Sequence, residues 1–427
     1  MAAAENRLES QSGDAGTGVG PLHLSTAAPA LPLRQVVFEA VRAKGRAARS
    51  ELARGLNVSP ASVSAVTNDL IGAGYLAETR AALRDADTGR GRPPVALCVR
   101  ADAGHVAGIK IAQTGHTAVV HDFAGREVAS VTVPGDGPRL DGAAAAGRVE
   151  TLLREVLRRA DLPTEALLAV GVGLPGFIDS AAGTVLWSPL LDERNLRFAA
   201  DIAGRVGLPV VIDNDANLLT LAELWFGSGR AVSNFAVVTI EHGVGMGLVI
   251  DNRLYRGARG LGTELGHMKV HLDGALCQCG QRGCLEAYVS DYALLREAGT
   301  ALAWQGANAD PAVVLESLYA HAKAGNEAAR SIFRRAGRYL AVGLGNVINL
   351  FDPELVLISG ARMRYDYLYA DEVLAEMRRM AILVDRPAPR VEAHVWGDLI
   401  WARGAAALAL SQTTTDRLGA GGLVAAQ

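Results

Sequence analysis

Four side chains that commonly bind transition metals are concentrated in one short stretch of the sequence. His267 is followed by Cys277, Cys279 and Cys284, a spacing of H-x9-C-x-C-x4-C. Three thiolates and one imidazole form a closed tetrahedral donor set that suits structural zinc. A disulfide is the alternative, but a C-x-C pair is too close for a relaxed disulfide and one cysteine would be left over. The spacing therefore predicts a structural Zn²⁺ site.

Two carboxylates flank this predicted metal loop, Glu264 before His267 and Glu286 after Cys284. A metal ion that closes the loop would hold both acids near the imidazole, whose second nitrogen could meet a hydroxyl group. Hydrogen bonds from hydroxyls to ionised carboxylates are worth roughly 1.5 to 3 kcal/mol each. The stretch is therefore a candidate site for a polyol.

The same stretch resembles a known family signature. Glu-Leu-Gly-His at 264–267 and Cys-Gln-Cys-Gly-Gln-Arg-Gly-Cys-Leu-Glu at 277–286 are similar to the signature of the ROK family, bacterial sugar kinases and sugar-responsive repressors. The resemblance covers about residues 32 to 410. It implies an α/β body with the actin-like ATPase (ribonuclease H-like) fold, two lobes and a sugar in the cleft between them. The sugar contacts that it implies are Gly176, Ser188, Asn214, Asp215, Glu264, His267 and Glu286.

The acids of this set favour a neutral sugar over a sugar phosphate, because Asp215, Glu264 and Glu286 would repel an anion. In the kinases of the family, the acid that matches Asp215 is the general base for phosphoryl transfer. An Asx turn that caps a helix is a simpler explanation of the local sequence Asp-Asn-Asp-Ala-Asn at 213–217, and it is compatible with a sugar contact.

The phosphate loops that the resemblance implies for the kinases are altered. The first is usually Asp-x-Gly-Gly-Thr and here is Lys-Ile-Ala-Gln-Thr at 110–114. The second is usually Gly-Thr-Gly-x-Gly and here is Glu-His-Gly-Val-Gly at 241–245, where Glu241 would repel phosphate by several kcal/mol. A third element, usually Gly-Gly, is Ser359-Gly360. We therefore expect no enzyme, with Asp215 as a vestigial base.

The N-terminal region is basic, although the whole chain has a formal net charge of −3. Residues 34–100 contain eleven Arg and Lys against six Asp and Glu, so the rest of the chain is acidic. A basic head on an acidic body is typical of a nucleic-acid-binding module.

The pattern within residues 32–100 predicts a winged helix-turn-helix. Ser50 can cap one helix, and Ser59 followed by Pro60 begins another that extends to Ile71. Strands at 75–79 and 95–99 would flank a loop that contains Arg90 and Arg92, which could enter a minor groove. The predicted DNA contacts are Ser59, Ser62, Ser64, Asn68, Arg90 and Arg92. A helical protein-docking module is the alternative for this region.

The body shows a repeated opening. Strand-like segments at 105–112, 117–121 and 127–133 precede a helix at about 143–160 and a strand at 167–172, and a second β-rich start follows at 235–240 and 247–250. Helical patterns follow at 288–298, 311–324 and 327–350, with a core strand at 355–358. We predict a disordered arm (1–31), the head (32–100), a first lobe (102–218, completed by a closing helix at 399–410), a second lobe with the zinc loop (219–398) and a tail (411–427).

These features predict a sugar-responsive transcriptional regulator, in particular a repressor that a neutral sugar releases from operator DNA, acting as a homodimer or a dimer of dimers. The enzyme alternative is an ATP-dependent hexose or N-acylhexosamine kinase with an accessory head. A ligand-blind architectural DNA-binding protein is a third class. No apolar run approaches the ~18 residues of a membrane span, and residues 1–30 do not resemble a signal peptide. We expect a bacterial cytoplasmic protein, at the nucleoid when bound to its operator.

Overall fold

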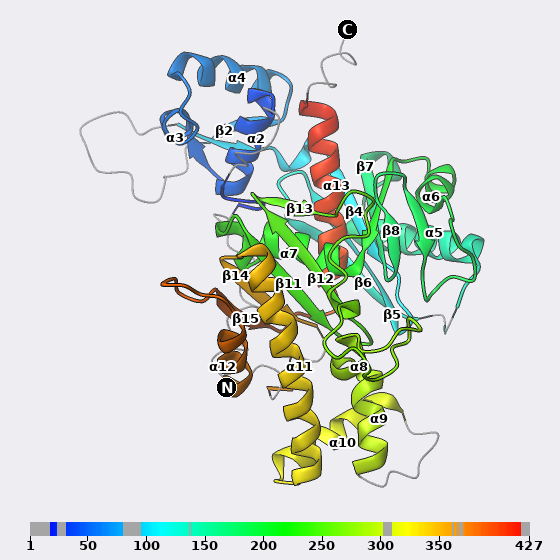
Figure 1. The fold of residues 1–427 in the computed structure, drawn as a ribbon. Coiled ribbons are helices and arrows are strands. Elements are labelled where there is room, and N and C mark those ends of the chain that lie inside the picture. The colour runs from blue at the N-terminus through cyan, green and yellow to red at the C-terminus, as the bar shows by residue number, and fades with distance from the viewer. Residues whose placement is uncertain are drawn as a thin grey trace.

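The N-terminal head consists of three helices and a small antiparallel sheet (Figure 1). The computed structural model describes residues 18–23, 31–79, 95–135, 137, 139–301, 310–360, 363, 365–366 and 370–419. The head elements are α2 (Leu33–Lys44), β1 (Ala47–Ala48), α3 (Arg49–Gly55), α4 (Pro60–Gly72), β2 (Leu76–Thr79) and β3 (Ala96–Val99), with strand order β1-β3-β2. This arrangement fits the predicted winged helix-turn-helix. Arg90 and Arg92 lie outside the described residues.

Local capping explains where the two helices of the motif begin. Ser59 accepts a hydrogen bond from the backbone N–H of Ser62 (3.0 Å), and Pro60 occupies the first turn of α4, as predicted. The predicted cap at Ser50 is wrong. α3 begins at Arg49 with Ala48 as its N-cap, two residues earlier than a cap at Ser50 requires, because Ala47 and Ala48 pair with β3, and the Ala48 N–H donates to the Glu51 carboxylate (2.9 Å). The strand thus fixes the start of the helix.

The body contains two five-stranded sheets with the same topology, which confirms the predicted repeat. The first sheet has the order β10-β7-β4-β5-β6 and the second β13-β12-β11-β14-β15. In each, three antiparallel strands are followed by two strands added in parallel. The strands are β4 (His105–Lys110), β5 (Gly115–Asp122), β6 (Glu127–Pro134), β7 (Leu167–Leu174), β10 (Val210–Asn214), β11 (Phe235–Ile240), β12 (Val244–Ile250), β13 (Arg253–Tyr255), β14 (Leu355–Ser359) and β15 (Arg390–His394).

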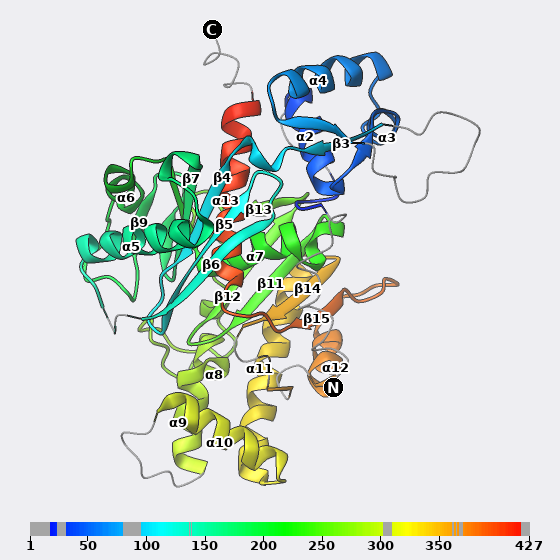
Figure 2. The ribbon, with the colours of Figure 1, turned by 180° about the vertical axis from the view of Figure 1, so that it is seen from behind.

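The helices form three layers, one on the outer face of each sheet and one between the two sheets (Figures 1 and 2). α5 (Gly142–Ala160) and α6 (Phe198–Val206) cover the outer face of the first sheet. The outer face of the second sheet is covered by α8 (Glu286–Val289), α9 (Asp291–Ala301), α10 (Pro311–Lys323), α11 (Glu327–Phe351) and α12 (Asp371–Met380). Between the sheets lie α7 (Asp215–Phe226) and α13 (Ile400–Leu418). A hairpin of β8 (Phe177–Asp179) and β9 (Thr184–Trp187) extends the first lobe.

Strand alternation explains how the second sheet packs on both faces. Along β11, Ala236 and Val238 face the outer helices, whereas Phe235 and Val237 face α7 and α13. Side chains of period two point to opposite faces of a sheet, so a strand buried on both sides is apolar throughout. The central helices therefore belong to the cores of both lobes.

Glycines allow α13 to approach its neighbours at backbone distance. A Cβ atom at Gly108 in β4 would lie 2.0 Å from the Ala402 carbonyl oxygen, and one at Gly171 in β7 would lie 1.9 Å from that of Ala405. On the other side of the helix, a Cβ at Gly404 would lie 1.9 Å from the Leu218 carbonyl oxygen of α7. α13 is consequently fixed between the first sheet and α7.

Three predicted boundaries need correction. The lobe boundary at 218/219 falls inside α7, a continuous helix that packs on both sheets. The tail predicted from residue 411 is wrong for 411–418, because α13 continues to Leu418 and buries Thr413 and Thr414. The predicted disordered arm is wrong at residues 18–23, which are hydrogen-bonded to the head and to the body, for example from the Val19 N–H to the Arg42 carbonyl (3.0 Å).

The helical patterns of the second lobe are otherwise close to the structure. The helix predicted at 288–298 is interrupted at Ser290, where α8 ends and α9 begins. In the described part of the chain, no helix is both long and apolar enough to cross a bilayer.

Candidate functional site

The four predicted metal ligands lie together. The ligand atoms of His267, Cys277, Cys279 and Cys284 are all within 4.8 Å of one another. The Sγ atoms of Cys279 and Cys284 are 3.7 Å apart, and Cys277 Sγ lies 3.8 Å from His267 Nδ1. Two thiolates bound at about 2.3 Å to one tetrahedral ion would be separated by roughly this distance, whereas disulfide sulfurs lie about 2.05 Å apart. The cluster could therefore hold a metal ion.

The loop that carries the cysteines folds through positive-φ glycines. Gly283 has φ +77°, and a Cβ there would lie 1.8 Å from the His271 carbonyl oxygen, so only glycine fits. The turn brings Cys284 opposite Lys269, where an isolated β-bridge forms. Lys269 Nζ donates to Cys284 Sγ at 2.9 Å. This ammonium group, which the sequence prediction did not include, offsets negative charge on the thiolates.

Three carboxylates converge beside the metal cluster. Burial raises the pKa of Glu264 to about 7, with further contributions from the charges of Asp215 and Glu286. Burial also raises the pKa of Asp215, although Lys110 acts in the opposite direction. Such mutual effects require short separations in a partly buried site. The predicted acids are therefore brought together, and their oxygens can accept hydrogen bonds from neutral hydroxyl groups.

Asn214 and Asp215 stand where β10 ends and α7 begins. The Asn214 side-chain oxygen caps α7 by accepting from the Asn217 N–H (2.8 Å), as the Asx-turn interpretation expected. Asp215 Oδ1 accepts from the Ala216 N–H (2.9 Å). The structure therefore places both residues at the end of β10, where Asp215 acts on the pKa of Glu264.

Gly176 and Ser188 form one structural unit. Gly176 has φ +126°, and a Cβ there would lie 2.2 Å from the Trp187 carbonyl oxygen. Ser188 is completely buried and its hydroxyl donates to the Pro175 carbonyl (2.7 Å). The predicted sugar contact at Ser188 is therefore not supported: this hydroxyl is used inside the protein, where it holds the Pro175–Gly176 turn.

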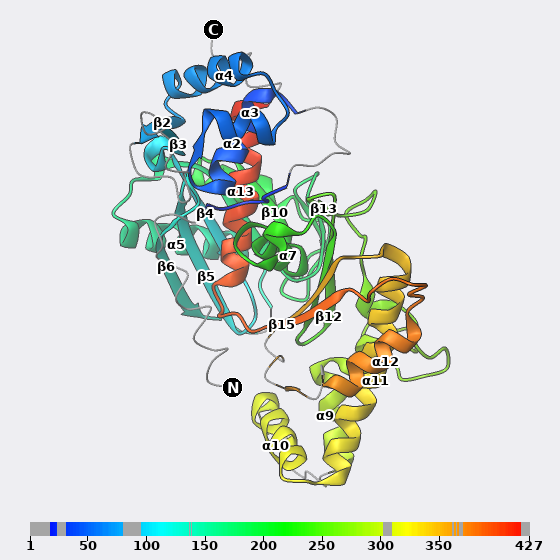
Figure 3. The same cartoon turned by 90° about the vertical axis from the view of Figure 1, so that its left-hand side faces the viewer.

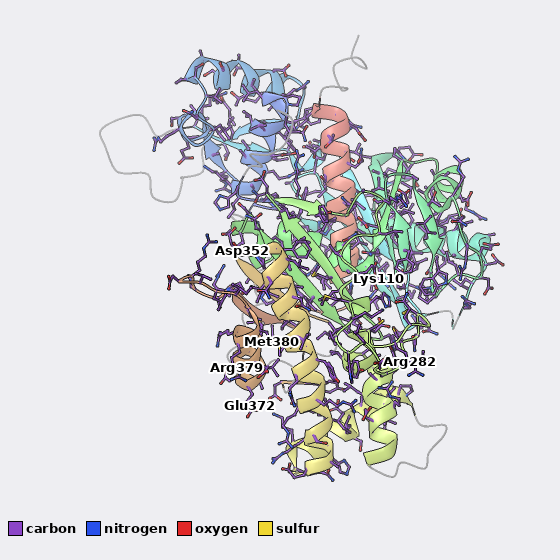
Figure 4. The ribbon with its side chains drawn as sticks, in the orientation of Figure 1. Lys110, Arg282, Asp352, Glu372, Arg379 and Met380 are labelled. Atoms are coloured by element: carbon purple, nitrogen blue, oxygen red, sulfur yellow. The ribbon has the colours of Figure 1, made fainter. Side chains whose placement is uncertain are left out.

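Lys110 lies at the end of β4, beside the N-terminal turn of α13 (Figure 4). Its Nζ is 3.4 Å from the ring centroid of Trp401, a close cation–π contact. The altered second loop lies near Glu286, since a Cβ at Gly243 would be 2.7 Å from Glu286 Oε2. The Val244 N–H in that loop donates to the same oxygen (3.2 Å). The Glu286 carboxylate thus accepts a hydrogen bond from a backbone N–H of this loop.

Two ionic contacts in the body were not predicted. Arg256, after β13, contacts Asp213 at the end of β10, and the Asp213 side chain is 1% exposed. Glu223 in α7 is fully buried and accepts hydrogen bonds from His394 Nδ1 (2.7 Å) and Trp396 Nε1 (2.6 Å). A buried acid in an apolar strand or helix indicates that a partner must exist, but the sequence does not identify a partner many residues away.

The predicted nucleic-acid surface is the outward face of α4, which lies on the side of the head away from the lobes (Figures 1 and 2). Ser59 and Asn68 are exposed there, and Ser62 and Ser64 are half-buried. Ser64 donates to the Pro60 carbonyl (2.8 Å). Asn68 accepts from Arg49 (3.2 Å), a basic residue that the prediction missed and that also contacts Glu78 (2.8 Å).

Comparison with known proteins points in two functional directions. Residues 106–412 match the sequence model described as the ROK family. The chain is 27% identical over 377 residues to a xylose repressor of Caldicellulosiruptor bescii, covering 85% of this chain and 91% of the relative. It is 34% identical over 259 residues to a glucokinase of Streptomyces coelicolor, covering 57% of this chain and 80% of the relative.

A solved structure shares the whole architecture. It is described as a ROK family transcriptional regulator, a homologue of the Mlc protein of Escherichia coli, and it superimposes with a TM-score of 0.75 at 27% identity. The superposition covers 90% of this chain and 98% of that structure.

Proposed function

Because the chain belongs to the ROK family, we propose that it is a DNA-binding transcriptional repressor that leaves its operator when a neutral sugar binds between the lobes. The observation that carries this proposal is the presence of a winged helix-turn-helix head and of three converging carboxylates in one chain. The family region, residues 106–412, makes up about 72% of the chain, so the repressor alignment, which covers 85%, extends beyond it.

In this proposal the sugar is held by Asn214, Asp215, Glu264, His267 and Glu286, with the backbone at Gly176. The carboxylates accept hydrogen bonds from sugar hydroxyls, and their combined negative charge disfavours a sugar phosphate. Xylose and glucose are the first sugars to test, because a xylose repressor and a glucokinase are among the relatives.

Zn²⁺ is the metal that fits three sulfur donors and one imidazole nitrogen. His267, Cys277, Cys279 and Cys284 would hold it in a closed structural site. When bound, the ion supplies a cross-link for the loop between Leu265 and Glu286. His267 faces the cluster through Nδ1, which leaves Nε2 for a ligand hydroxyl.

The DNA would be bound by α4 in a major groove, with Ser59, Ser62, Ser64 and Asn68 facing the base edges and phosphates. Arg90 and Arg92 would enter the adjacent minor groove. A homodimer or a dimer of dimers would present two heads to two half-sites. We place this activity in the bacterial cytoplasm, at the nucleoid when the operator is occupied.

The kinase is the second candidate, favoured by the 34% identity to a glucokinase. Against phosphoryl transfer stand the cation at Lys110, where the kinases have an acid for magnesium, and the acidic groups Glu241 and Glu286 around the second loop. These charges oppose the binding of a nucleotide with its metal ion. We therefore propose that the chain is not an enzyme.

One experiment separates the classes. The protein is titrated on DNA from upstream of its own gene in a mobility-shift assay, and D-xylose, D-glucose and N-acetylglucosamine are added one at a time. A repressor predicts a retarded band that one sugar releases. A parallel coupled assay with ATP and the same sugars should show no turnover, and turnover would favour the kinase. DNA binding that no sugar alters would favour an architectural protein.

A further inference from the structure

We propose that Arg42 couples the sugar site to the DNA-binding head by joining helix α7 to helix α2. This inference rests on the proposed function. Helix α7 begins at Asp215, in the carboxylate cluster, and ends beside the head at Trp225 and Phe226. Twelve residues at about 1.5 Å each give a rod of roughly 18 Å. One rigid element therefore has the sugar site at one end and the head at the other.

Helix α7 is suited to move as a unit. All residues from Ala216 to Trp225 are buried, and the helix packs against α13 and both sheets. Close-packed interiors transmit displacement because they hold few voids. A ligand that displaces Asp215 must therefore displace the whole helix.

Arg42 joins its own helix, α2, to α7 and α13 at the C-terminal end of α7. It lies near the end of α2 and is 3% exposed. Its Cζ is 4.5 Å from the ring centroid of Trp225 in α7 and 5.3 Å from that of Phe38 in α2. Its Nη1 donates to Thr414 Oγ1 in α13 at 2.8 Å. Views of the molecule from the side place α2 directly against the last turns of α13 (Figure 3).

Residues 18–23 reinforce this junction from outside. The Val19 N–H donates to the Arg42 carbonyl (3.0 Å), and the Gly20 N–H donates to the Trp225 carbonyl (2.9 Å). Arg230 Nη2 donates to the Ala43 carbonyl (2.6 Å). A Cβ at Gly18 would lie 2.2 Å from the Arg42 carbonyl oxygen, so the segment fits only because this residue is glycine. The segment thus binds the ends of α2 and α7 to each other.

The junction also contains buried polar atoms that are not satisfied. In the described part of the chain, Arg42 Nε, Gln35 Oε1, Thr413 Oγ1 and His121 Nε2 are buried without a hydrogen-bond partner. Buried donors and acceptors are nearly always paired in stable proteins, because leaving one unpaired is costly. A second arrangement of α2 on α13 and α7 could satisfy some of these atoms. The junction therefore has the character of a two-state contact rather than of a permanent core.

A buried cation–π contact resists separation, so Trp225 and the Arg42 side chain should move together. Sugar that shifts α7 would then re-orient α2 and, with it, α4. By reciprocity, DNA that selects one arrangement must weaken sugar binding by the same factor as sugar weakens DNA binding.

The test uses the full-length protein with an Arg42→Met substitution, which keeps the unbranched stem of the side chain and removes the guanidinium charge and its hydrogen bond to Thr414. The probe is D-xylose, D-glucose or N-acetylglucosamine, whichever releases the wild-type protein from DNA upstream of its own gene. In the wild type, sugar should raise the operator Kd about tenfold or more. In the variant, the rise should fall below about twofold, while the Kd for sugar alone and the Kd for operator alone each stay within about threefold of wild type.

Two further variants keep the result interpretable. Thr414→Val keeps the shape of the side chain and removes the hydroxyl that accepts from Arg42 and donates to the Leu410 carbonyl, and it should reduce the coupling with less risk to folding. Arg205→Met removes an arginine of α6 that pairs with Glu150 of α5 (3.9 Å) on the outer face of the first lobe, and it should leave the coupling intact. If Arg42→Met and Thr414→Val respond to sugar as the wild type does, the inference is overturned and the proposed function stands. If none of the three sugars affects the wild type, both fail.

Discussion

Arg256 and Asp213 form an ion pair that joins the two lobes. Arg256 Nε and Nη2 lie 2.8 and 2.7 Å from Asp213 Oδ2. The other oxygen, Oδ1, accepts hydrogen bonds from the Asn217 side chain (2.8 Å) and from the Asn214 backbone (2.9 Å). The same carboxylate therefore holds the first turn of α7 and the loop of the second lobe that leads to Glu264.

Replacing Asp213 with Asn should weaken this connection. The substitution leaves the Arg256 charge without its partner, and Arg256 is only 29% exposed. We expect a loss of about 1 to 3 kcal/mol in the free energy of unfolding, because breaking a partly buried ion pair leaves one charge uncompensated. Denaturant unfolding measures this change. Asp201→Asn, on the exposed face of α6, is the control and should be neutral. Equal effects of the two substitutions would contradict the interpretation.

Replacing Cys284 with Ser should remove the metal. Three ligands remain, and zinc sites of this kind need all four donors for a closed shell. Elemental analysis of purified protein should find about one zinc per chain in the wild type and almost none in the variant. Because the metal would cross-link the loop that carries Glu264 and Glu286, the variant should also lose sugar binding.

Cys98→Ser is the matched control for this prediction, since Cys98 lies in β3 of the head, where its thiol donates to the Ala77 carbonyl (3.7 Å). It should retain both zinc and sugar binding. A Cys284→Ser protein with a full zinc content would show that the metal assignment is wrong.

Local sequence patterns were sufficient for most of the fold. The apolar, β-branched segment from Phe235 to Ile240 and its counterpart in the first lobe predicted two β-rich lobes, and both sheets have the same strand order. Ser59 and Pro60 marked the start of α4 correctly because a cap depends on neighbouring residues. The four metal ligands came together because three of them lie within eight residues, so their geometry is also local.

The features that the sequence did not reveal depend on distant contacts. Ser188 has the right type for a sugar contact, but whether its hydroxyl faces a ligand or the Pro175 carbonyl depends on how β9 returns to the turn. The last two turns of α13 are polar, with Thr413 and Thr414, and they are buried only because the head packs on them. Residues 18–23 have no periodicity, so their docking site at Arg42 and Trp225 could not be predicted.

The stability of the protein should depend on pH through His394. Burial lowers the pKa of His394, but its hydrogen bond to the Glu223 carboxylate (2.7 Å) and its contact with Glu392 (3.4 Å) outweigh burial and raise the pKa above 6.5. A histidine with a raised pKa in the folded state stabilises fully below pH 6.5. This stabilisation is lost as the pH rises through the folded-state value.

We therefore expect the wild-type free energy of unfolding to fall as the pH rises from about 6 through that range. His394→Gln should reduce this pH dependence, which thermal unfolding at several pH values measures. His321→Gln, on an exposed part of α10, should leave the wild-type pH profile unchanged. An unaltered profile for His394→Gln would refute the assignment.

Replacing Glu264 with Gln should abolish the sugar response while DNA binding persists. Above the Glu264 pKa of about 7 the side chain is a charged acceptor. Gln keeps its shape and removes the charge, which costs roughly 1.5 to 3 kcal/mol per hydrogen bond and so raises the sugar Kd, measured at a pH above that value, about 10- to 100-fold. Calorimetry gives the sugar Kd and a mobility shift gives the operator Kd. Glu372→Gln, at an exposed position in the first turn of α12 (Figure 4), is the control. Sugar affinity that is unchanged in Glu264→Gln would exclude this acid from the site.

Replacing both Arg90 and Arg92 with Ala should weaken operator binding and its dependence on salt. Each arginine that neutralises DNA phosphate charge contributes about 0.9 to the slope of log K against log salt. The double variant should therefore lower the slope by as much as about 2 and leave the sugar Kd unchanged. Arg378→Ala with Arg379→Ala removes the same charge from α12, where Arg379 lies far from the head (Figure 4), and it should leave the slope nearly unchanged. If the two double variants lose affinity and slope equally, the loss reflects net charge alone and the predicted minor-groove contact is wrong.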